Sequence, residues 1–256
     1  MTKIDLNCDM GEGFGVYELG DDEAMLDVVT SANIACGFHA GDPLVMARTL
    51  AAAKTRNVGV GAHPSFLDLW GFGRRPIQGE RPADVEKTII YQIGALQALA
   101  HAGGHELTHV KTHGSLGNMA NEDIELARAV ARAIKAVNPN YIFIVMPGLP
   151  TERAGEEQGL RMAREIYADR AYAENGNLLS RKLEGAVIHD AEAAADRVLR
   201  MVETQEVVTA GGKRLPLRVD TICVHGDTPG AVAMARRVRE RLEAAGIDVA
   251  PMAGWL

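Results

Sequence analysis

Residues 4–9 read Ile-Asp-Leu-Asn-Cys-Asp, an alternation of apolar and polar side chains near the start of the chain. Successive side chains on a β-strand point to opposite faces, so a strand here has one apolar and one polar face. The polar face carries Asp5, Asn7 and Asp9. Inside a fold these groups need hydrogen-bond partners, because each unpaired one costs about 1–3 kcal/mol.

Two later stretches show the same one-sided polarity. In 107–113 the alternate residues are His109, Lys111 and His113, and in 165–169 they are Glu, Tyr and Asp. An open, doubly wound sheet is covered by helices on both faces, so its central strands should be apolar on both. A polar face turned into a narrow lumen, under an outer ring of helices, is typical of a barrel. We therefore predict an α/β fold built on a β/α barrel, with an open sheet as the alternative.

Short β-branched or apolar runs alternate along the chain with Ala-, Arg- and Glu-rich stretches of helical period. The predicted strands are 4–9, 32–36, 58–63, 107–113, 141–146, 165–169 and 221–225. The predicted helices are 22–30, 43–56, 82–102, 122–137, 152–161, 191–204 and 229–245. This order is typical of parallel βα units. We predict a single domain over 1–256, with a β-hairpin on a Gly-Gly turn at 206–218.

The composition excludes several classes of protein. The 256 residues are 47% apolar and carry a formal net charge of −7, which argues against a nucleic-acid-binding surface. No stretch approaches the ~20 apolar residues of a membrane span, and the charged start is unlike a signal peptide. Three cysteines without C-x-x-C spacing argue against a disulfide framework or a zinc-thiolate site. We predict a cytoplasmic protein that binds neither membranes nor nucleic acid.

Polar residues capable of catalysis gather where the predicted strands end. In parallel α/β folds these carboxyl ends form the mouth in which loops build the active site. Each residue alone has a structural explanation, such as a cap or a buried hydrogen bond. Several strands that offer His, Lys or Asp at the same end favour a shared site. The candidates are Asn7, Asp9, Asn33, His39, His63, Lys111, His113, Arg170, His225 and Asp227.

Local motifs exclude some chemistries and leave others open. Neither G-x-G-x-x-G, nor a P-loop, nor a G-x-S-x-G nucleophile elbow occurs in the sequence. Asp9, His39 and His63 form a candidate ligand set for a divalent ion, although the H-x-H pair usual in metal-dependent amidohydrolase barrels is missing. Residues 225–230 open a predicted helix whose free N–H groups suit an anion, and an ordinary cap by Thr228 is the simpler explanation.

Six strings at the strand ends together resemble one family. They are DLNCDMGE at 5–12, NIACGFHAGDP at 33–43, GAHPS at 61–65, GFGRR at 71–75, ADR at 168–170 and VHGD at 224–227. In this order they are similar to the LamB/YcsF family, and the resemblance runs from the first predicted strand to the end of the chain. The strings are long enough to make the resemblance specific.

This resemblance implies an irregular seven-stranded β/α barrel, similar to the glycoside hydrolase and deacetylase barrels. It also implies ATP-hydrolysing 5-oxoprolinase activity, in which the lactam of 5-oxoproline is opened to L-glutamate. The implied cofactor is ATP with Mg²⁺, and the implied partners are two other 5-oxoprolinase subunits, B and C. Whether ATP binds this chain or a partner stays open, as does homo-oligomerisation.

The chemistry implied by the resemblance suits the residue types. ATP would phosphorylate the lactam oxygen and make a leaving group for attack by water. The predicted catalytic residues are Asp9, Lys111 and His113, with Asp9 or His113 as general base and Lys111 meeting anionic charge. We expect Lys111→Ala to lower turnover by orders of magnitude and to change stability far less, since a lumen lysine buries little apolar surface.

The other candidates are assigned to substrate or phosphate binding, and Asn7 and Asn33 would orient the amide. Residues 109–118 read HVKTHGSLGN where the family usually has HVKPHGALYN, so Thr112, Ser115 and Gly117 depart from the pattern. We expect these departures to leave the lysine and histidine roles in place and to alter either substrate fit or the rigidity of the loop. Two alternatives remain, a metal-dependent deacetylase or amidohydrolase of a sugar or amide, and a non-catalytic scaffold subunit. The predicted binding residues are Asn7, Asn33, His39, His63, Arg170, His225 and Asp227.

Overall fold

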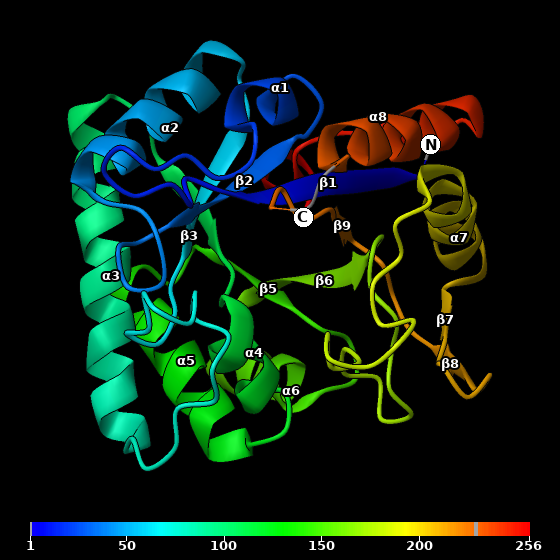
Figure 1. Ribbon diagram of the computed structural model, residues 1–256. Helices are drawn as coiled ribbons and strands as arrows, with labels where there is room; N and C mark the ends of the chain where they lie inside the picture. Colours follow the sequence, from blue (N-terminus) through cyan, green and yellow to red (C-terminus); the bar gives the residue numbers. More distant parts are fainter. Residues whose placement is uncertain (1, 228–229) are drawn as a thin grey trace.

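The computed structural model describes residues 2–227 and 230–256, and within them seven parallel strands close into a barrel (Figure 1). The last of these strands pairs with the first, and Asp5 lies opposite Thr221. This closure confirms the predicted barrel and excludes an open sheet. In order around the barrel the strands are β1 (Lys3–Met10), β2 (Ser31–Ala35), β3 (Gly59–His63), β4 (Leu107–Val110), β5 (Ile142–Val145), β6 (Arg161–Tyr167) and β9 (Thr221–Cys223).

Helices surround the strands (Figure 1). The buried face of α3 carries Ile89, Ile93 and Leu96, the spacing that places apolar side chains on one side of a helix. Among the described residues, no helix is long and apolar enough to cross a membrane. The helices are α1 (Asp22–Leu26), α2 (Pro43–Thr55), α3 (Pro82–Ala102), α4 (Gly114–Ala120), α5 (Ile124–Val137), α6 (Pro150–Gln158), α7 (Ala191–Thr204) and α8 (Ala231–Ala244).

The start of α2 follows from its first residues. The carboxylate of Asp42 accepts hydrogen bonds from the backbone N–H groups of Leu44 and Val45, while Pro43 takes the first helical position. This arrangement satisfies N–H groups that have no partner within the helix. The last predicted helix, at 229–245, corresponds to α8, and Thr228 and Pro229 lie outside the described residues.

Several regions differ from the sequence-based prediction, among them the predicted helices 22–30 and 152–161, which end at Leu26 and Gln158. The predicted strand 107–113 ends at Val110, and the unpredicted helix α4 follows; its sequence GSLGNMA has two glycines, which weaken a helical signal. The predicted strand 165–169 instead spans Arg161–Tyr167, because its charged first half hides the strand pattern. A short strand β10 (Asp248–Val249), paired with β1, and a 3₁₀ helix η1 (Met252–Gly254) lie outside the predicted elements.

The predicted hairpin at 206–218 is present as an excursion from the barrel. Strand β7 (Glu206–Val208) pairs antiparallel with β8 (Arg214–Pro216), and Gly212 in the turn has φ 86°. Glycine adopts positive φ without the steric cost that other residues have there.

The barrel lumen is closed by side chains at the end where the strands begin. Met252 of η1 is fully buried in a cluster with Ile142, Ile144 and Ala163. Asp5 accepts hydrogen bonds from Ser31 Oγ (2.6 Å), Thr221 Oγ1 (2.5 Å) and the backbone N–H of Met252 (3.2 Å). The polar face of β1 is therefore satisfied inside the lumen, as the alternation in residues 4–9 predicts.

Gly61 of β3 makes room for a lumen histidine. A Cβ atom at this position would lie 2.2 Å from Cδ2 of His109. Because glycine has no Cβ atom, the imidazole of His109 can lie against strand β3. Its Nε2 hydrogen-bonds to Asn33 Oδ1 at 3.0 Å. The glycine is thus needed for close approach of a side chain to the backbone.

Candidate active site

A cavity of about 460 Å³ lies at the carboxyl ends of the barrel strands, where the sequence predicts a shared site. This volume suits a small-molecule ligand. Six predicted residues line the cavity: Asp9, His63, Lys111, His113, Arg170 and His225. The other four predicted residues lie outside the lining: Asn7, Asn33, His39 and Asp227.

Lys111 is the centre of a buried charge network at the base of the cavity. Its Nζ lies 3.0 Å from Asp9 Oδ1 and 2.8 Å from Glu165 Oε1, and all three residues are buried. Burial opposes the charge on Lys111, but the carboxylates outweigh it and raise the pKa of the ammonium group. Burial also opposes ionisation of Asp9, while His63 and Lys111 hold its pKa well below the usual range. The network therefore keeps an ammonium and a carboxylate charged beside the cavity.

These ion pairs change the stability expected of Lys111→Ala. Removing the lysine would leave two buried carboxylates without their shared cation, and breaking a buried pair costs about 3–5 kcal/mol. We therefore expect a loss of stability together with the loss of turnover, in place of the small stability change expected from the sequence.

Asn7 and Asn33 lie deeper in the lumen than the cavity and support the charged residues. The Asn33 amide donates to Asn7 Oδ1 (2.7 Å) and Asp9 Oδ1 (2.9 Å). The Asn7 amide donates to Glu165 Oε1 (3.0 Å) and Thr221 Oγ1 (2.7 Å). Both asparagines are fully buried, so their contacts fix the orientation of the two carboxylates around Lys111. That they orient a substrate amide stays a prediction.

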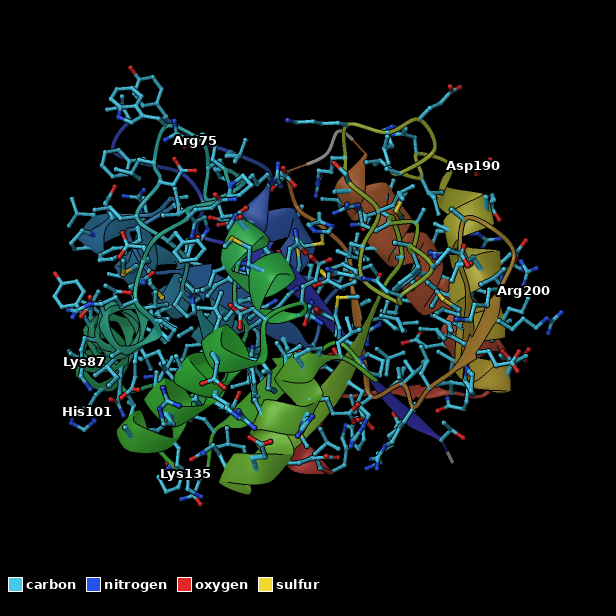
Figure 2. The ribbon with its side chains drawn as sticks, turned by 90° about the horizontal axis from the view of Figure 1, so that it is seen from below. Arg75, Lys87, His101, Lys135, Asp190 and Arg200 are labelled. Carbon is cyan, nitrogen blue, oxygen red and sulfur yellow. The ribbon has the colours of Figure 1, made fainter. Side chains whose placement is uncertain are left out.

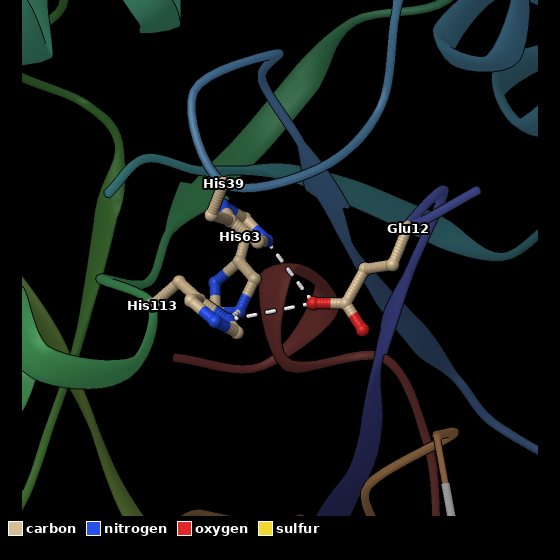
Figure 3. A group of neighbouring side chains, drawn as sticks. All are labelled: Glu12, His39, His63 and His113. Atoms are coloured by element: carbon tan, nitrogen blue, oxygen red, sulfur yellow. Dashed lines mark hydrogen bonds and ion pairs between the residues drawn. The ribbon is translucent and has the colours of Figure 1, made fainter. Parts of the chain in front are cut away.

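A second cluster lies beside this network and consists of three histidines and one glutamate (Figure 3). Glu12 Oε1 lies 3.1 Å from His39 Nε2 and 3.4 Å from His113 Nδ1, and His113 Nδ1 lies 3.0 Å from His63 Nε2. The rings of His39 and His113 stack with centroids 3.7 Å apart. We call Glu12, His39, His63 and His113 the histidine cluster.

Burial determines the protonation tendencies within the histidine cluster. It lowers the pKa of His39 and of His113 well below the ordinary value, and neighbouring histidines add to the effect. Burial raises the pKa of Glu12, to which the negative charge of Asp9 also contributes. The predicted metal set was Asp9, His39 and His63; the structure groups His39 and His63 with Glu12 and His113, and Asp9 with Cys223 and His225.

The loop between β3 and α3 closes over the histidine cluster. The carbonyl oxygen of Phe72 accepts a hydrogen bond from His113 Nε2 at 2.9 Å, and the Phe72 ring meets His39 and His113 edge to face. Phe72 has φ 52°, an uncommon conformation for a bulky residue. The next residue, Gly73, has no room for a Cβ, which would lie 2.7 Å from the His113 ring and 2.8 Å from His39 Cβ. The GFGRR string therefore shapes the loop that positions two histidines.

His225 and Asp169 form a hydrogen-bonded pair at the ends of β9 and β6. His225 Nδ1 lies 2.9 Å from both carboxylate oxygens of Asp169. Burial opposes ionisation of Asp169, but the charges of His225 and Arg181 lower the pKa of this carboxyl below its usual value. A carboxylate on Nδ1 fixes the ring orientation and leaves Nε2 available as a proton acceptor. His225 borders the cavity, so the pair is suited to proton transfer there.

Arg170 and Asp227 have local partners within the protein. The Arg170 guanidinium borders the cavity and donates to the carbonyl oxygens of Leu179 (2.6 Å) and Ala186 (3.3 Å). Asp227 pairs with Arg74 at 2.8 Å, and Arg74 also borders the cavity. Both predicted binding roles stay predictions, and Arg74 adds a positive charge that the sequence-based candidate set omits.

His101, a histidine outside the candidate set, lies on the surface. His101 lies at the periphery with Lys87 and Lys135 (Figure 2), and its side chain is 83% exposed. This position agrees with the solvated role that its place at the end of a predicted helix suggests.

Three acidic site residues are absent from the sequence-based candidates. Glu165 and Asp169 lie on the predicted polar face of the sixth strand, so face alternation could have selected them. Glu12 follows the end of β1, where alternation no longer applies. Its signal in the sequence is its place in the DLNCDMGE string.

The fold and site define a parallel β/α-barrel protein with a charged cavity at the strand ends, where enzymes of this architecture hold their active sites. The chain belongs to the LamB/YcsF family, which it matches over residues 4–256. This membership confirms the resemblance seen in the strand-end strings.

Individual relatives cover almost the whole chain. A protein of Rhodopseudomonas palustris, named as the A subunit of 5-oxoprolinase, is 57% identical over 98% of this chain and 99% of its own length. The crystal structure of a lactam utilization protein from Thermus thermophilus has a TM-score of 0.91 and 44% identity, covering 97% of this chain and 99% of that one. A T48 deacetylase solved with substrate has a TM-score of 0.51 at 12% identity, covering 98% and 88% of the two chains, and shares the fold alone.

Proposed function

We propose that this chain is the lactam-opening subunit of an ATP-hydrolysing 5-oxoprolinase. The observation that carries the proposal is the 57% identity, over nearly the full length of both chains, to a relative named as the A subunit of 5-oxoprolinase. The reaction would convert 5-oxoproline to L-glutamate with ATP and Mg²⁺. Two partner subunits, B and C, would complete the enzyme.

The chemistry balances in three steps. The γ-phosphoryl group of ATP passes to the lactam oxygen, and ADP leaves. Water then adds to the activated ring carbon, and the ring C–N bond breaks as the nitrogen takes a proton. A second water hydrolyses the resulting acyl phosphate to glutamate and phosphate. The site must therefore stabilise anionic oxygen, remove a proton from water and protonate the leaving nitrogen.

The charged residues of the cavity suit these tasks. Lys111 and Arg170 border the cavity and offer positive charge to a carboxylate, a phosphate or a developing oxyanion. Their charges lie beside a polar lumen that already fixes the position of Lys111 Nζ. A preorganised cation of this kind stabilises a transition state without further reorganisation.

His225 is the residue best suited to proton transfer in this proposal. Asp169 orients its ring, so Nε2 can take a proton from water and return it to the ring nitrogen. Asp9 is a weaker candidate for general base, because its pKa is held low and its charge is engaged by Lys111. His113 is also less suited, because its Nε2 donates to the Phe72 carbonyl oxygen and its Nδ1 lies against His63 Nε2 at 3.0 Å and Glu12 Oε1 at 3.4 Å.

The decisive experiment is reconstitution with and without this chain. Glutamate and phosphate release from 5-oxoproline and Mg-ATP should require this chain together with both partner subunits. A nucleotide-binding measurement on the isolated subunits would then show which of them holds ATP.

The two alternatives predict different results in the same assay. A non-catalytic scaffold would leave lactam opening intact when Lys111 or His225 is replaced in an assembled complex. A metal-dependent deacetylase would release acetate from an acetylated sugar or amide with added metal and without ATP. The first result would refute the proposed activity, and the second would favour the deacetylase.

A further inference from the structure

The tautomers of two buried histidines are set by backbone carbonyl groups. His63 Nδ1 lies 2.8 Å from the carbonyl oxygen of Lys111, and His113 Nε2 lies 2.9 Å from that of Phe72. A carbonyl oxygen only accepts, so each of these ring nitrogens carries a hydrogen. In the neutral rings, His63 Nε2 and His113 Nδ1 are then lone-pair acceptors. They lie 3.0 Å apart and face each other, with the Glu12 carboxylate beside them.

Three acceptors converging in a buried space repel one another unless a cation lies between them. The side chains concerned are nearly inaccessible to water, with His63 1%, His113 3% and Glu12 7% exposed. Their negative and lone-pair atoms therefore have little solvent to compensate for this approach. Either a cation at the centre of the histidine cluster or an added proton, for example on Glu12, whose pKa burial raises, would remove this repulsion.

We propose that the histidine cluster binds a divalent transition-metal ion, and that Zn²⁺ fits it best. Three imidazole nitrogens and one carboxylate oxygen form a donor set that suits zinc. The hydrogen bonds from His63 and His113 to backbone carbonyls are the outer contacts that usually orient metal-binding imidazoles. The site stands on these contacts and does not depend on the lactam chemistry.

The distances within the histidine cluster match a tetrahedron around zinc. Ligand atoms at about 2.0–2.2 Å from the metal are about 3.3–3.6 Å apart along the edges of a regular tetrahedron. Three edges measure 3.1 Å (Glu12–His39), 3.4 Å (Glu12–His113) and 3.0 Å (His63–His113). All four ligand atoms lie within 4.8 Å of one another. The stacked rings of His39 and His113 cannot both direct a lone pair at one ion, so binding requires His39, whose Nδ1 has no hydrogen-bond partner among the described residues, to rotate out of the stack.

Four protein ligands would fill the coordination sphere, which is typical of a structural zinc site. The ion would join the end of β1, the loop after β2, the end of β3 and the start of α4. It would also place positive charge behind the cavity wall, since His63 Nε2 lies 3.3 Å from Asp9 Oδ2. The ion would thus fix two cavity residues, His63 and His113, in place.

The competing explanation is a proton. An added hydrogen on His63 Nε2, shared with Asp9 and His113, would also remove the repulsion. The two explanations separate in a metal analysis, because a shared proton needs no metal ion.

The test uses the full chain, stripped with a chelator and equilibrated with Zn²⁺. Elemental analysis after gel filtration should give about one Zn²⁺ per chain, and X-ray absorption should show a shell of nitrogen and oxygen with imidazole scattering. The melting temperature should rise with free Zn²⁺, because a ligand of the folded state stabilises it. Glu12→Gln and His39→Gln should each weaken Zn²⁺ binding at least about tenfold.

The exposed residue His101 supplies the control, and His101→Gln should bind Zn²⁺ as the unmodified chain does. The proposal fails if the unmodified chain retains no Zn²⁺ after gel filtration or if both cluster variants bind it unchanged. Circular dichroism establishes whether a variant is folded. If neither variant folds, the absorption spectrum of the unmodified chain decides, and a shell without imidazole ligands overturns the site.

Discussion

Lys111 Nζ lies 3.0 Å from Asp9 Oδ1, and this ion pair joins the end of β4 to β1 inside the lumen. Glu165 from β6 approaches the same ammonium group from another strand, at 2.8 Å. One cation therefore compensates two buried carboxylates contributed by different strands. Lys111, which is proposed to stabilise anionic oxygen in the reaction, therefore also links β1, β4 and β6 at the carboxyl end of the barrel.

We predict that Lys111→Met lowers turnover by orders of magnitude, because a lost charge at a developing anion costs roughly 3–4 kcal/mol. It should also lower the free energy of unfolding by about 3–5 kcal/mol, since two carboxylates lose their partner. Lys111→Met combined with Glu165→Gln should recover part of the stability and none of the activity. Urea unfolding and turnover of the reconstituted enzyme measure the two effects. Normal turnover in the folded single variant would contradict the role of Lys111 in catalysis.

The sequence predicts the lumen face and the strand-end location of this network, because both follow from side-chain alternation along β1 and β4. It does not predict which charges pair. Lys111 meets Glu165 only because β6 and β9 close the barrel beside β1, and that register depends on the whole sheet. Periodicity reports which way a side chain points, whereas pairing requires the positions of distant strands.

Side-chain periodicity also fails to predict how the residues of the histidine cluster come together. His39, His63 and His113 are strand-end candidates, but their convergence depends on the chain path after β1 and on the loop that carries Phe72. Glu12 and Phe72 lie outside regular strands, so no period of two or 3.6 residues selects them. In the sequence, these two positions are indicated only by the family strings DLNCDMGE and GFGRR, which contain Glu12 and Phe72.

We predict that Asp169→Asn lowers kcat by about 10²–10⁴-fold and changes KM little. The amide N–H can donate to Nδ1 and so favour the tautomer in which Nε2 carries the hydrogen, and general acid–base catalysis contributes about this much. The pH profile of kcat should also change, which a purely structural role of Asp169 would not cause. Steady-state kinetics of the reconstituted enzyme provide the check, with Asp190→Asn, a helix cap outside the cavity, as the matched control. Equal losses in both variants would remove the Asp169–His225 pair from the mechanism.

A pair of glycine substitutions tests the packing of the lumen. Gly61→Ala should destabilise the protein by about 1–3 kcal/mol, because the added Cβ would lie 2.2–2.5 Å from atoms of the His109 ring. Gly94→Ala, on helix α3 with no atom within 4 Å of the new Cβ, should stabilise it by about 0.5–1 kcal/mol. Urea unfolding of both variants measures the difference. Equal effects at the two positions would mean that His109 does not lie against Gly61.

The pH dependence of stability tests the buried state of His109. Burial lowers the pKa of this imidazole from 6.5 to about 3, and the charge of Lys111 adds to the shift. Between these values the unfolded chain binds a proton that the folded chain excludes. The contribution to stability is therefore complete above pH 6.5 and decreases as the pH falls towards 3. The slope contributed by one such group is at most about 1.4 kcal/mol per pH unit.

Replacing His109 by Gln removes this titration while keeping a side-chain N–H that can donate to Asn33 Oδ1. The free energy of unfolding of His109→Gln should be lower than that of the unmodified chain at pH 7, and the two curves should converge as the pH falls. Urea unfolding at intervals between pH 7 and pH 4 gives the two curves. The exposed His101 serves as control, because His101→Gln removes a histidine that stays accessible to solvent and should leave the slope nearly unchanged. If the curves for His109→Gln and the unmodified chain run parallel, then His109 binds its proton equally well in the folded and unfolded chain, and the neutral lumen histidine is refuted.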